Sequence, residues 1–362
     1  MGKPKNNSDG IDFIYYEESV KNMIEFLQRQ SRHLYPGYFA MVMATGALSL
    51  SLWYLDILFA AELLMYFNVF IFVLLLVLNG LRLLLNTRDF MKDLNDNGKG
   101  PGFFTLIAAS GVLGSQFVII KNMTETGFIF WLAAFIIWII LMYTFFTLII
   151  IKRVKPLIDE SVNGGWLLVV VSTQSLAVLG TLAANSTDFA EVMIFISLCL
   201  FLLGCALYLN IIAFIFYRLM FLKIEVMSLT PPYWISMGAL AITTLAGSVL
   251  VLNGSGIVPE LEIFIKGFTL FFWALGTWWI PLLIILGVWR HIVNRYPLSY
   301  TPELWGMAFP IAMYTVGTTN LSMALELEFL MIIPHVTIFA AVLVWLLIMA
   351  GLISHHGKRL RN

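Results

Sequence analysis

A helix-start motif recurs five times along this chain, and in each copy one or two turn-forming or helix-breaking residues lead into an aromatic residue. The copies are Pro36-Gly37-Tyr38-Phe39, Pro101-Gly102-Phe103-Phe104, Gly164-Gly165-Trp166, Pro231-Pro232-Tyr233-Trp234 and Pro302-Glu303-Leu304-Trp305. Successive copies begin 65, 63, 67 and 71 residues apart. This spacing is too long for one helix and suits two membrane-spanning helices with their loops. The repeat therefore predicts five helical hairpins, which amount to ten transmembrane helices.

The composition supports a membrane protein, because 60% of the residues are hydrophobic, 12% are charged and the mean hydropathy is +0.90. Soluble domains of this length do not have such a composition. Predominantly apolar windows cover 36–55, 63–85, 102–120, 127–151, 165–184, 191–217, 231–252, 263–289, 302–324 and 329–353. Each is near or above the roughly 20 residues that cross a bilayer as a helix. Because lipid cannot satisfy free backbone groups, we expect an all-α polytopic fold.

The basic residues are distributed unevenly over the predicted loops. Of the 21 Lys and Arg residues, 19 fall in the N-terminal segment, in the loops after even-numbered spans or in the C-terminal tail. By the positive-inside rule, both termini are expected on the cytoplasmic side of the plasma or inner membrane. The expected organisation is a cytoplasmic N-terminal segment (1–34), a transmembrane transport domain (35–353) and a cytoplasmic C-terminal tail (354–362). Apolar residues in the first segment, from Val20 to Leu27, have the spacing of an amphipathic helix, and a flexible tail is the alternative.

The odd-numbered predicted helices differ in composition from the even-numbered ones. The odd helices are rich in small and hydroxylated residues, as in Ala44-Thr45-Gly46-Ala47, whereas the even helices are bulky, as in 70–78. Small residues permit close helix approach, and hydroxyl groups bond across helices or line a hydrated path. We therefore expect an inner ring of five odd helices surrounded by five even ones. Glu303, at the start of the ninth helix, is the one charged residue in the odd helices.

Sequence motifs for enzymatic chemistry are missing. The chain contains no phosphate-binding loop, nucleophile elbow or HExxH zinc motif. We therefore expect neither an enzyme nor a protein that uses a cofactor, a metal or a nucleic acid. His335, beside Pro334, is the single histidine inside a predicted span, where either a proton-linked role or helix packing would explain it.

Five stretches resemble the tellurite-resistance/dicarboxylate transporter family, which includes fungal malate and sulfite transporters and plant slow-type anion channels. They are YPGYFAMVMATGALSLSLWYL at 35–55, WLLVVVSTQSLAVLG at 166–180, LTPPYWISMGALAITTLAG at 229–247, GTWWIPLL at 276–283 and YTPELWGMAFPIAMYT at 300–315. The resemblance runs over about residues 34–353. It implies a homotrimer in which each protomer has its own central pore with quasi-five-fold symmetry, lined by the odd helices.

The resemblance also implies that a phenylalanine in an aromatic-proline step of the ninth helix gates the pore, which here is Phe309-Pro310. Phe309 lies seven residues after Pro302, and the same offset in the other copies falls on smaller or more flexible residues. The predicted pore-lining residues are Met43, Thr45, Ser49, Ala108, Ser110, Val171, Thr173, Gly238, Thr243 and Met313. Hydroxyl groups and backbone donors among them are expected to replace part of the anion's hydration shell.

Three functions are compatible with these observations. The leading one is a channel or facilitator for small anions such as C4-dicarboxylates, sulfite, nitrate, chloride or tellurite-like oxyanions. The second is a proton-coupled C4-dicarboxylate (malate-type) carrier or a sulfite or tellurite efflux protein on the same fold. In the carrier, His335 is the candidate proton-linked residue. The third, an intramembrane enzyme or sensor, requires a polar cluster within the spans that the sequence does not contain.

Overall fold

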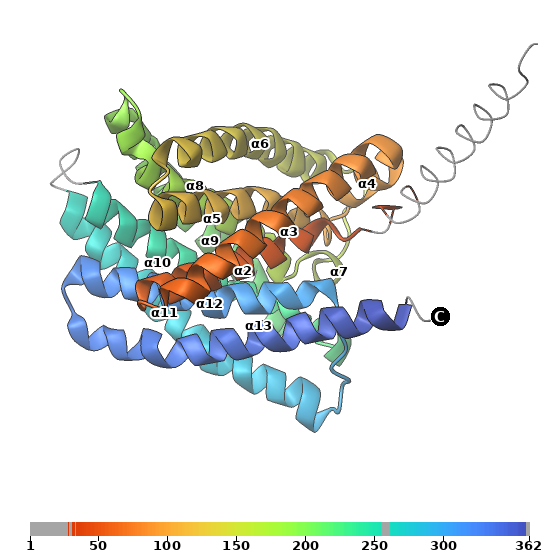
Figure 1. Ribbon diagram of the computed structural model, residues 1–362. Helices are drawn as coiled ribbons and strands as arrows, with labels where there is room; N and C mark the ends of the chain where they lie inside the picture. Colours follow the sequence, from red (N-terminus) through yellow and green to blue (C-terminus); the bar gives the residue numbers. More distant parts are fainter. Residues whose placement is uncertain (1–27, 29–30, 33, 255–260, 360–362) are drawn as a thin grey trace, which may run out of the picture.

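The computed structural model describes residues 28, 31–32, 34–254 and 261–359, and the regular structure in this part of the chain is entirely helical (Figure 1). The long helices are α2 (Ala40–Tyr54), α3 (Leu58–Leu85), α5 (Phe104–Lys121), α6 (Thr124–Ile151), α8 (Leu168–Ala183), α9 (Ala190–Phe221), α10 (Ile235–Asn253), α11 (Glu262–Val288), α12 (Trp305–Leu325) and α13 (Ile332–Arg359). The short helices are α4 (Thr87–Leu94) and α7 (Ile158–Ser161). The amphipathic helix predicted at Val20 to Leu27 lies outside the described residues.

Each copy of the helix-start motif folds into a 3-10 turn that runs directly into the next long helix. These turns are η1 (Pro36–Phe39), η2 (Gly100–Phe103), η3 (Gly164–Leu167), η6 (Pro231–Trp234) and η9 (Pro302–Leu304). Proline suits this position because its φ angle is fixed near the helical value and the first helical N–H has no intrahelical partner. Gly164 replaces proline where a Cβ atom would collide with the Pro232 carbonyl group. The motif therefore marks five helix starts, as predicted.

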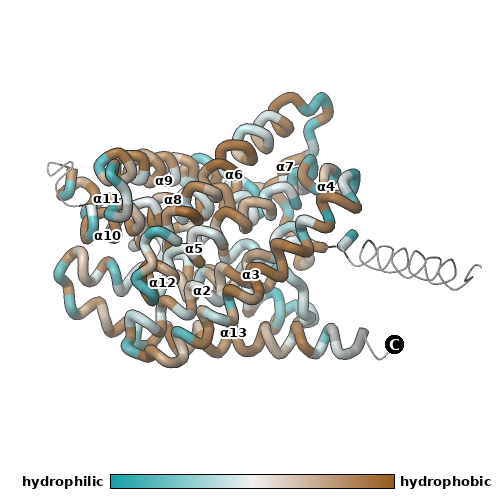
Figure 2. The backbone as a smooth tube through the Cα atoms, turned by 45° about the horizontal axis from the view of Figure 1, so that its top comes forward, coloured by the Kyte–Doolittle hydropathy of each residue, from teal (hydrophilic) through white to brown (hydrophobic). Residues whose placement is uncertain are grey.

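Five of the long helices form a closed ring. Helix α2 packs along α5, α5 along α8, α8 along α10, α10 along α12, and α12 returns to α2. The helices α3, α6, α9, α11 and α13 lie outside, each against the ring helix that precedes it in the chain and the one that follows in the ring. Figure 2 shows strongly apolar backbone along α3, α6 and α13, whereas α2, α5 and α12 are paler. The helices rich in small and hydroxylated residues are therefore the ring helices.

Length and composition identify eight helical segments, among the described residues, that could cross a membrane. They are Leu58–Leu85, Gly100–Lys121, Thr124–Ile151, Gly164–Ala183, Ala190–Phe221, Pro231–Asn253, Glu262–Val293 and Glu328–His355. Helices α2 and α12 are present but do not belong to this set, so the predicted count of ten is not reached by this criterion. The reason is composition, because α2 contains the hydroxylated residues Thr45, Ser49 and Ser51, and α12 carries a polar run from Thr315 to Asn320.

One side chain of every outer helix donates a hydrogen bond to the next ring helix. The five bonds are Asn68 Nδ2 (α3) to Gln116 Oε1 (α5) at 2.7 Å, Trp138 Nε1 (α6) to Thr173 Oγ1 (α8) at 3.0 Å, Tyr208 OH (α9) to the Ser236 carbonyl (α10) at 3.2 Å, Trp273 Nε1 (α11) to Thr318 Oγ1 (α12) at 3.0 Å, and Trp345 Nε1 (α13) to Thr45 Oγ1 (α2) at 3.0 Å. Interhelical bonds of this kind hold membrane helices together where apolar burial cannot. We call these five contacts the outer-to-ring bonds.

Basic residues near the C-terminal ends of four outer helices hold the segments that precede the ring helices. Arg218 of α9 donates to the Val162 carbonyl, and Arg290, just after α11, donates to the Leu229 carbonyl. Each acceptor lies two residues before the motif of the same hairpin. Lys152 bonds Asn97 Oδ1 at 3.0 Å, and Arg82 of α3 forms an ion pair with Asp93. The ring-helix starts are thus anchored to the outer layer.

Candidate functional site: a vestibule at the ring-helix starts

A cavity of about 110 Å³ lies at the end of the ring where its five helices begin, and we call it the vestibule. Its lining repeats with the motif. The residue after the first motif residue lines it in every copy, namely Gly37, Gly102, Gly165, Pro232 and Glu303. The residue four positions after the first also lines it in every copy, namely Ala40, Thr105, Leu168, Ile235 and Gly306. Corresponding positions of all five motifs therefore surround one space.

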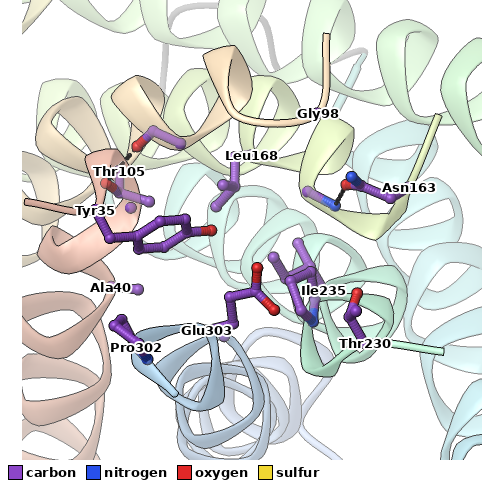
Figure 3. Close-up of a pocket in the computed structure, with 15 residues that line it drawn as sticks. Tyr35, Ala40, Gly98, Thr105, Asn163, Leu168, Thr230, Ile235, Pro302 and Glu303 are labelled. Atoms are coloured by element: carbon purple, nitrogen blue, oxygen red, sulfur yellow. Dashed lines mark hydrogen bonds between the residues drawn. The ribbon is translucent and has the colours of Figure 1, made fainter. Parts of the chain in front are cut away.

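Some polar side chains of the vestibule form hydrogen bonds with the described residues, and others do not. Asn163 Oδ1 accepts a hydrogen bond from the Gly165 backbone nitrogen at 2.8 Å, and Thr105 Oγ1 donates to the Gly102 carbonyl at 2.6 Å. The Tyr35 hydroxyl and the Glu303 carboxyl group instead point into the same part of the cavity (Figure 3). Neither group forms a hydrogen bond or an ion pair with any residue that the structure describes.

Burial and neighbouring charges change the pKa of both of these groups, which lie outside helices α2 and α12. Burial raises the pKa of the Glu303 carboxyl group, and the nearby Arg290 guanidinium opposes that shift. Burial raises the pKa of the Tyr35 hydroxyl, and the charge on Glu303 raises it further. The phenol therefore remains an O–H donor at physiological pH, and the carboxyl group gains a proton more readily than an exposed glutamate does.

The backbone adds a positive field to the vestibule. A helix N-terminus carries roughly half a unit of positive charge, and its first N–H groups have no intrahelical partners. Five helix starts face the vestibule, because the turns η1, η2, η3, η6 and η9 all contribute to its lining. Anions bind favourably at such termini. The vestibule is therefore an anion-attracting space that also contains one carboxyl group, Glu303.

Phe309, the predicted gate, and the residues at the same offset in the other four motif copies lie one helical turn beyond the vestibule lining. Met43, Ala108, Val171 and Phe309 are at most 1% exposed, and Gly238 is also buried. A Cβ atom placed on Gly238 would lie 2.6 Å from Pro310 Cγ, so α10 and α12 approach closely at this level. Met313, one turn further along α12, is buried as well.

The predicted pore-lining hydroxyl groups already have hydrogen bonds. Thr45 and Thr173 accept outer-to-ring bonds, and Ser49 Oγ donates to the Ala61 carbonyl of α3 at 2.7 Å. Ser110 Oγ donates to the Leu106 carbonyl at 2.9 Å, and Thr243 Oγ1 donates to the Ala239 carbonyl at 2.7 Å, within their own helices. These bonds show how the side chains contribute to helix packing, and the assignment of the residues to a pore stays a prediction.

His335 lies far from the vestibule in the fold. It is exposed near the start of α13, which follows the opposite end of α12, and its Nδ1 is 2.6 Å from the Met331 carbonyl oxygen. The titratable side chains that meet in the vestibule are instead Tyr35 and Glu303. The sequence did contain a signal for this site, because Glu303 occupies a motif position that holds glycine or proline in the other four copies.

Comparison with known proteins agrees with a membrane transport role. The family model described as SLAC1, voltage-dependent anion channel, matches residues 33–353. An uncharacterized transporter from Methanocaldococcus jannaschii is 27% identical over 303 residues, which cover 81% of this chain and 86% of the relative. An uncharacterized membrane protein from Mycobacterium tuberculosis is 35% identical over 150 residues, which cover 41% of this chain and 76% of the relative.

Proposed function

This chain belongs to the SLAC1 family of voltage-dependent anion channels, and from that premise we propose that it carries small anions across a membrane along the axis of its helix ring. The observation that carries the proposal is the vestibule, where corresponding positions of five helix starts surround one cavity. Such a space attracts anions through backbone dipoles without any basic side chain in its lining. The permeant anions that we propose are chloride, nitrate, sulfite, tellurite-like oxyanions and C4-dicarboxylates such as malate.

We propose that all ten long helices cross the membrane, including α2 and α12. Both helices lie in the ring, where neighbouring helices shield them from lipid, so a lower hydropathy is tolerated there. Basic residues gather at the vestibule end, including Arg82, Lys152, Arg218 and Arg290. By the positive-inside rule this end, and with it both chain termini, faces the cytoplasm of the cell. The proposal includes a homotrimer in which each protomer has its own quasi-five-fold pore.

We propose that Phe309 closes the pathway just beyond the vestibule. It is the one aromatic side chain in a layer that otherwise contains Met43, Ala108, Val171 and Gly238. Pro310 removes a backbone hydrogen-bond donor from α12 next to this ring, which lowers the cost of local helix movement. Anion passage then requires displacement of the Phe309 ring, and pore width and dehydration select among anions.

A proton-coupled carrier is the second candidate function, because a half-buried carboxyl group lies in the vestibule. In that case an inward proton gradient alone would drive uptake of an anion such as malate. Glu303 then joins His335 as a candidate proton-linked residue; His335 is exposed, and its Nδ1 lies 2.6 Å from the Met331 carbonyl oxygen of η10.

The test is the current through planar bilayers that contain the purified protein, with asymmetric potassium chloride, then nitrate, then malate. A reversal potential near the anion equilibrium potential supports the proposed function and ranks the anions. Bilayers prepared without protein are the control. A current whose reversal potential equals the potassium equilibrium potential would contradict the proposal. Malate uptake that occurs only under a proton gradient, without current, would favour the carrier.

A further inference from the structure

We infer that protonated Glu303 and Tyr35 together form a two-donor binding site for a small anion in the vestibule, and that ionised Glu303 excludes anions from it. This inference rests on the proposed function and deepens it. It identifies the side chains that an anion meets first and makes anion binding depend on a proton. Without the titratable Glu303 carboxyl group, the five helix starts would attract anions equally at every pH.

The geometry brings the two groups together from distant parts of the chain. Tyr35 directly precedes η1, Glu303 belongs to η9, and these two turns pack against each other. Both side chains enter the same cavity, and neither has a hydrogen-bond partner among the described residues (Figure 3). A protonated carboxyl group and a phenol each supply one O–H donor, whereas a carboxylate accepts only. Protonation therefore converts Glu303 from a competitor of the anion into one of its ligands.

Charge explains why the ionised form excludes an anion. The positive field of the five helix starts stabilises either the Glu303 carboxylate or a bound anion. Two like charges a few ångströms apart in a partly buried site weaken each other's binding by about tenfold or more. The carboxylate thus acts as a tethered anion in the vestibule. A proton on Glu303 removes that competition.

The charged and titratable groups that the structure describes near Glu303 leave its carboxyl group without an ion pair, so that it can gain or lose a proton. Those on the segments that meet η9 are Tyr35 before η1, Tyr38 of η1 and Tyr233 of η6, and the charge that acts on Glu303 is Arg290 after α11. Burial raises the pKa of Glu303, and Arg290 limits this increase without forming an ion pair with it. A bound anion favours the protonated form further. Anion flux should therefore rise as the pH falls through the pKa of Glu303 and decline above it.

The experiment measures chloride and nitrate flux into proteoliposomes at about pH 5 and about pH 8, with the membrane potential clamped. Neither anion titrates in this range, so any pH effect belongs to the protein. Wild-type flux should be about tenfold higher at the acidic pH. The Glu303→Gln variant should conduct at the high level at both pH values, because glutamine keeps a donor and never becomes charged. Tyr35→Phe should raise the half-saturating anion concentration about tenfold and retain the pH dependence.

Glu328→Gln is the matched control, because it removes an exposed carboxylate at the other end of α12. Its flux and pH dependence should equal those of the wild type. Glu303→Asp provides a second titratable variant if Glu303→Gln does not fold, and it should conduct with a retained pH dependence. If anions pass and Glu303→Gln keeps the wild-type pH dependence, the inference is wrong and the proposed function stands. If no variant, including Phe309→Ala, conducts any anion at either pH, the proposed function fails and the inference fails with it.

Discussion

Trp345 of α13 donates a hydrogen bond from its indole Nε1 to Thr45 Oγ1 of α2, 3.0 Å away, and so connects the last helix of the fold to a ring helix 300 residues earlier. Each of the other four outer helices makes an equivalent bond to the next ring helix. In a region where water is scarce, a polar group without a partner is costly. The outer-to-ring bonds therefore give each of the five donor groups a partner and position the outer layer on the ring.

The Trp345 to Thr45 bond should stabilise the fold by a measurable coupling energy. We expect Trp345→Phe and Thr45→Val to be non-additive in a double-mutant cycle, with a coupling of about 0.6–1.7 kcal/mol. The measurement is reversible unfolding in detergent micelles. Trp278→Phe is the control, because Trp278 is 50% exposed and its indole makes no hydrogen bond to the described residues. Simple additivity of the two substitutions would show that the contact contributes nothing.

Phe309→Ala should increase anion current about tenfold or more, because it removes the one ring that fills the layer beyond the vestibule. The measurement is single-protein conductance in planar bilayers. Phe272→Ala of α11 is the matched control, because Phe272 is also fully buried but lies in an outer helix. Both substitutions should destabilise the fold by about 3–5 kcal/mol through cavity formation. Equal currents in Phe309→Ala and the wild type would remove Phe309 from the gate.

Gly238→Ala should destabilise the ring, because its Cβ atom would lie 2.6 Å from Pro310 Cγ. Overpacking of this kind costs about 1–3 kcal/mol. Gly80→Ala in α3 is the control, because a Cβ atom there has no neighbour within 4 Å. That substitution should be stabilising by about 0.5–1 kcal/mol, since alanine loses less backbone entropy. Thermal unfolding compares the two variants, and a wild-type melting temperature for Gly238→Ala would contradict the close packing of α10 and α12.

Asp93→Asn should be far more destabilising than Asp89→Asn. Asp93 pairs with Arg82, whose side chain is 1% exposed, whereas Asp89 pairs with Arg32, whose side chain is 58% exposed. Loss of a buried partner costs about 3–5 kcal/mol, because the remaining charge stays out of water. A surface pair contributes about 0–1 kcal/mol. Urea unfolding distinguishes the two variants, and similar midpoints would show that Arg82 finds another partner.

Much of the secondary structure could be predicted from local sequence. The motif at Pro36, Pro231 and Pro302 marks helix starts, because proline is compatible with the first helical turn and not with the interior of most helices. The all-helical membrane architecture followed from composition. The division into ring and outer helices followed from side-chain size, because only small residues permit close helix packing on several sides.

The roles of individual polar residues could not be predicted in the same way. The sequence did not show that the hydroxyl groups of Thr45 and Thr173 accept bonds from tryptophans that lie 300 and 35 residues away, and the assignment of both residues to a pore stays a prediction. Glu303 drew attention as a charge in a neutral helix, but its meeting with Tyr35 depends on the packing of η9 against η1. Helical periodicity predicts which residues share a face of a helix, but it does not predict which other helix packs against that face.

The amino-acid sequence alone was sufficient to predict a helical membrane protein and the starts of five of its helices, because hydropathy and helix initiation are local properties. The closed ring, the outer-to-ring bonds and the vestibule arise only when helices from distant parts of the chain pack together. The distinction is physical, because the direction of a side chain and the burial of a carboxyl group depend on neighbours that the chain brings near only in the folded state. For this protein, the packing of five helix starts around one cavity placed Glu303 beside Tyr35.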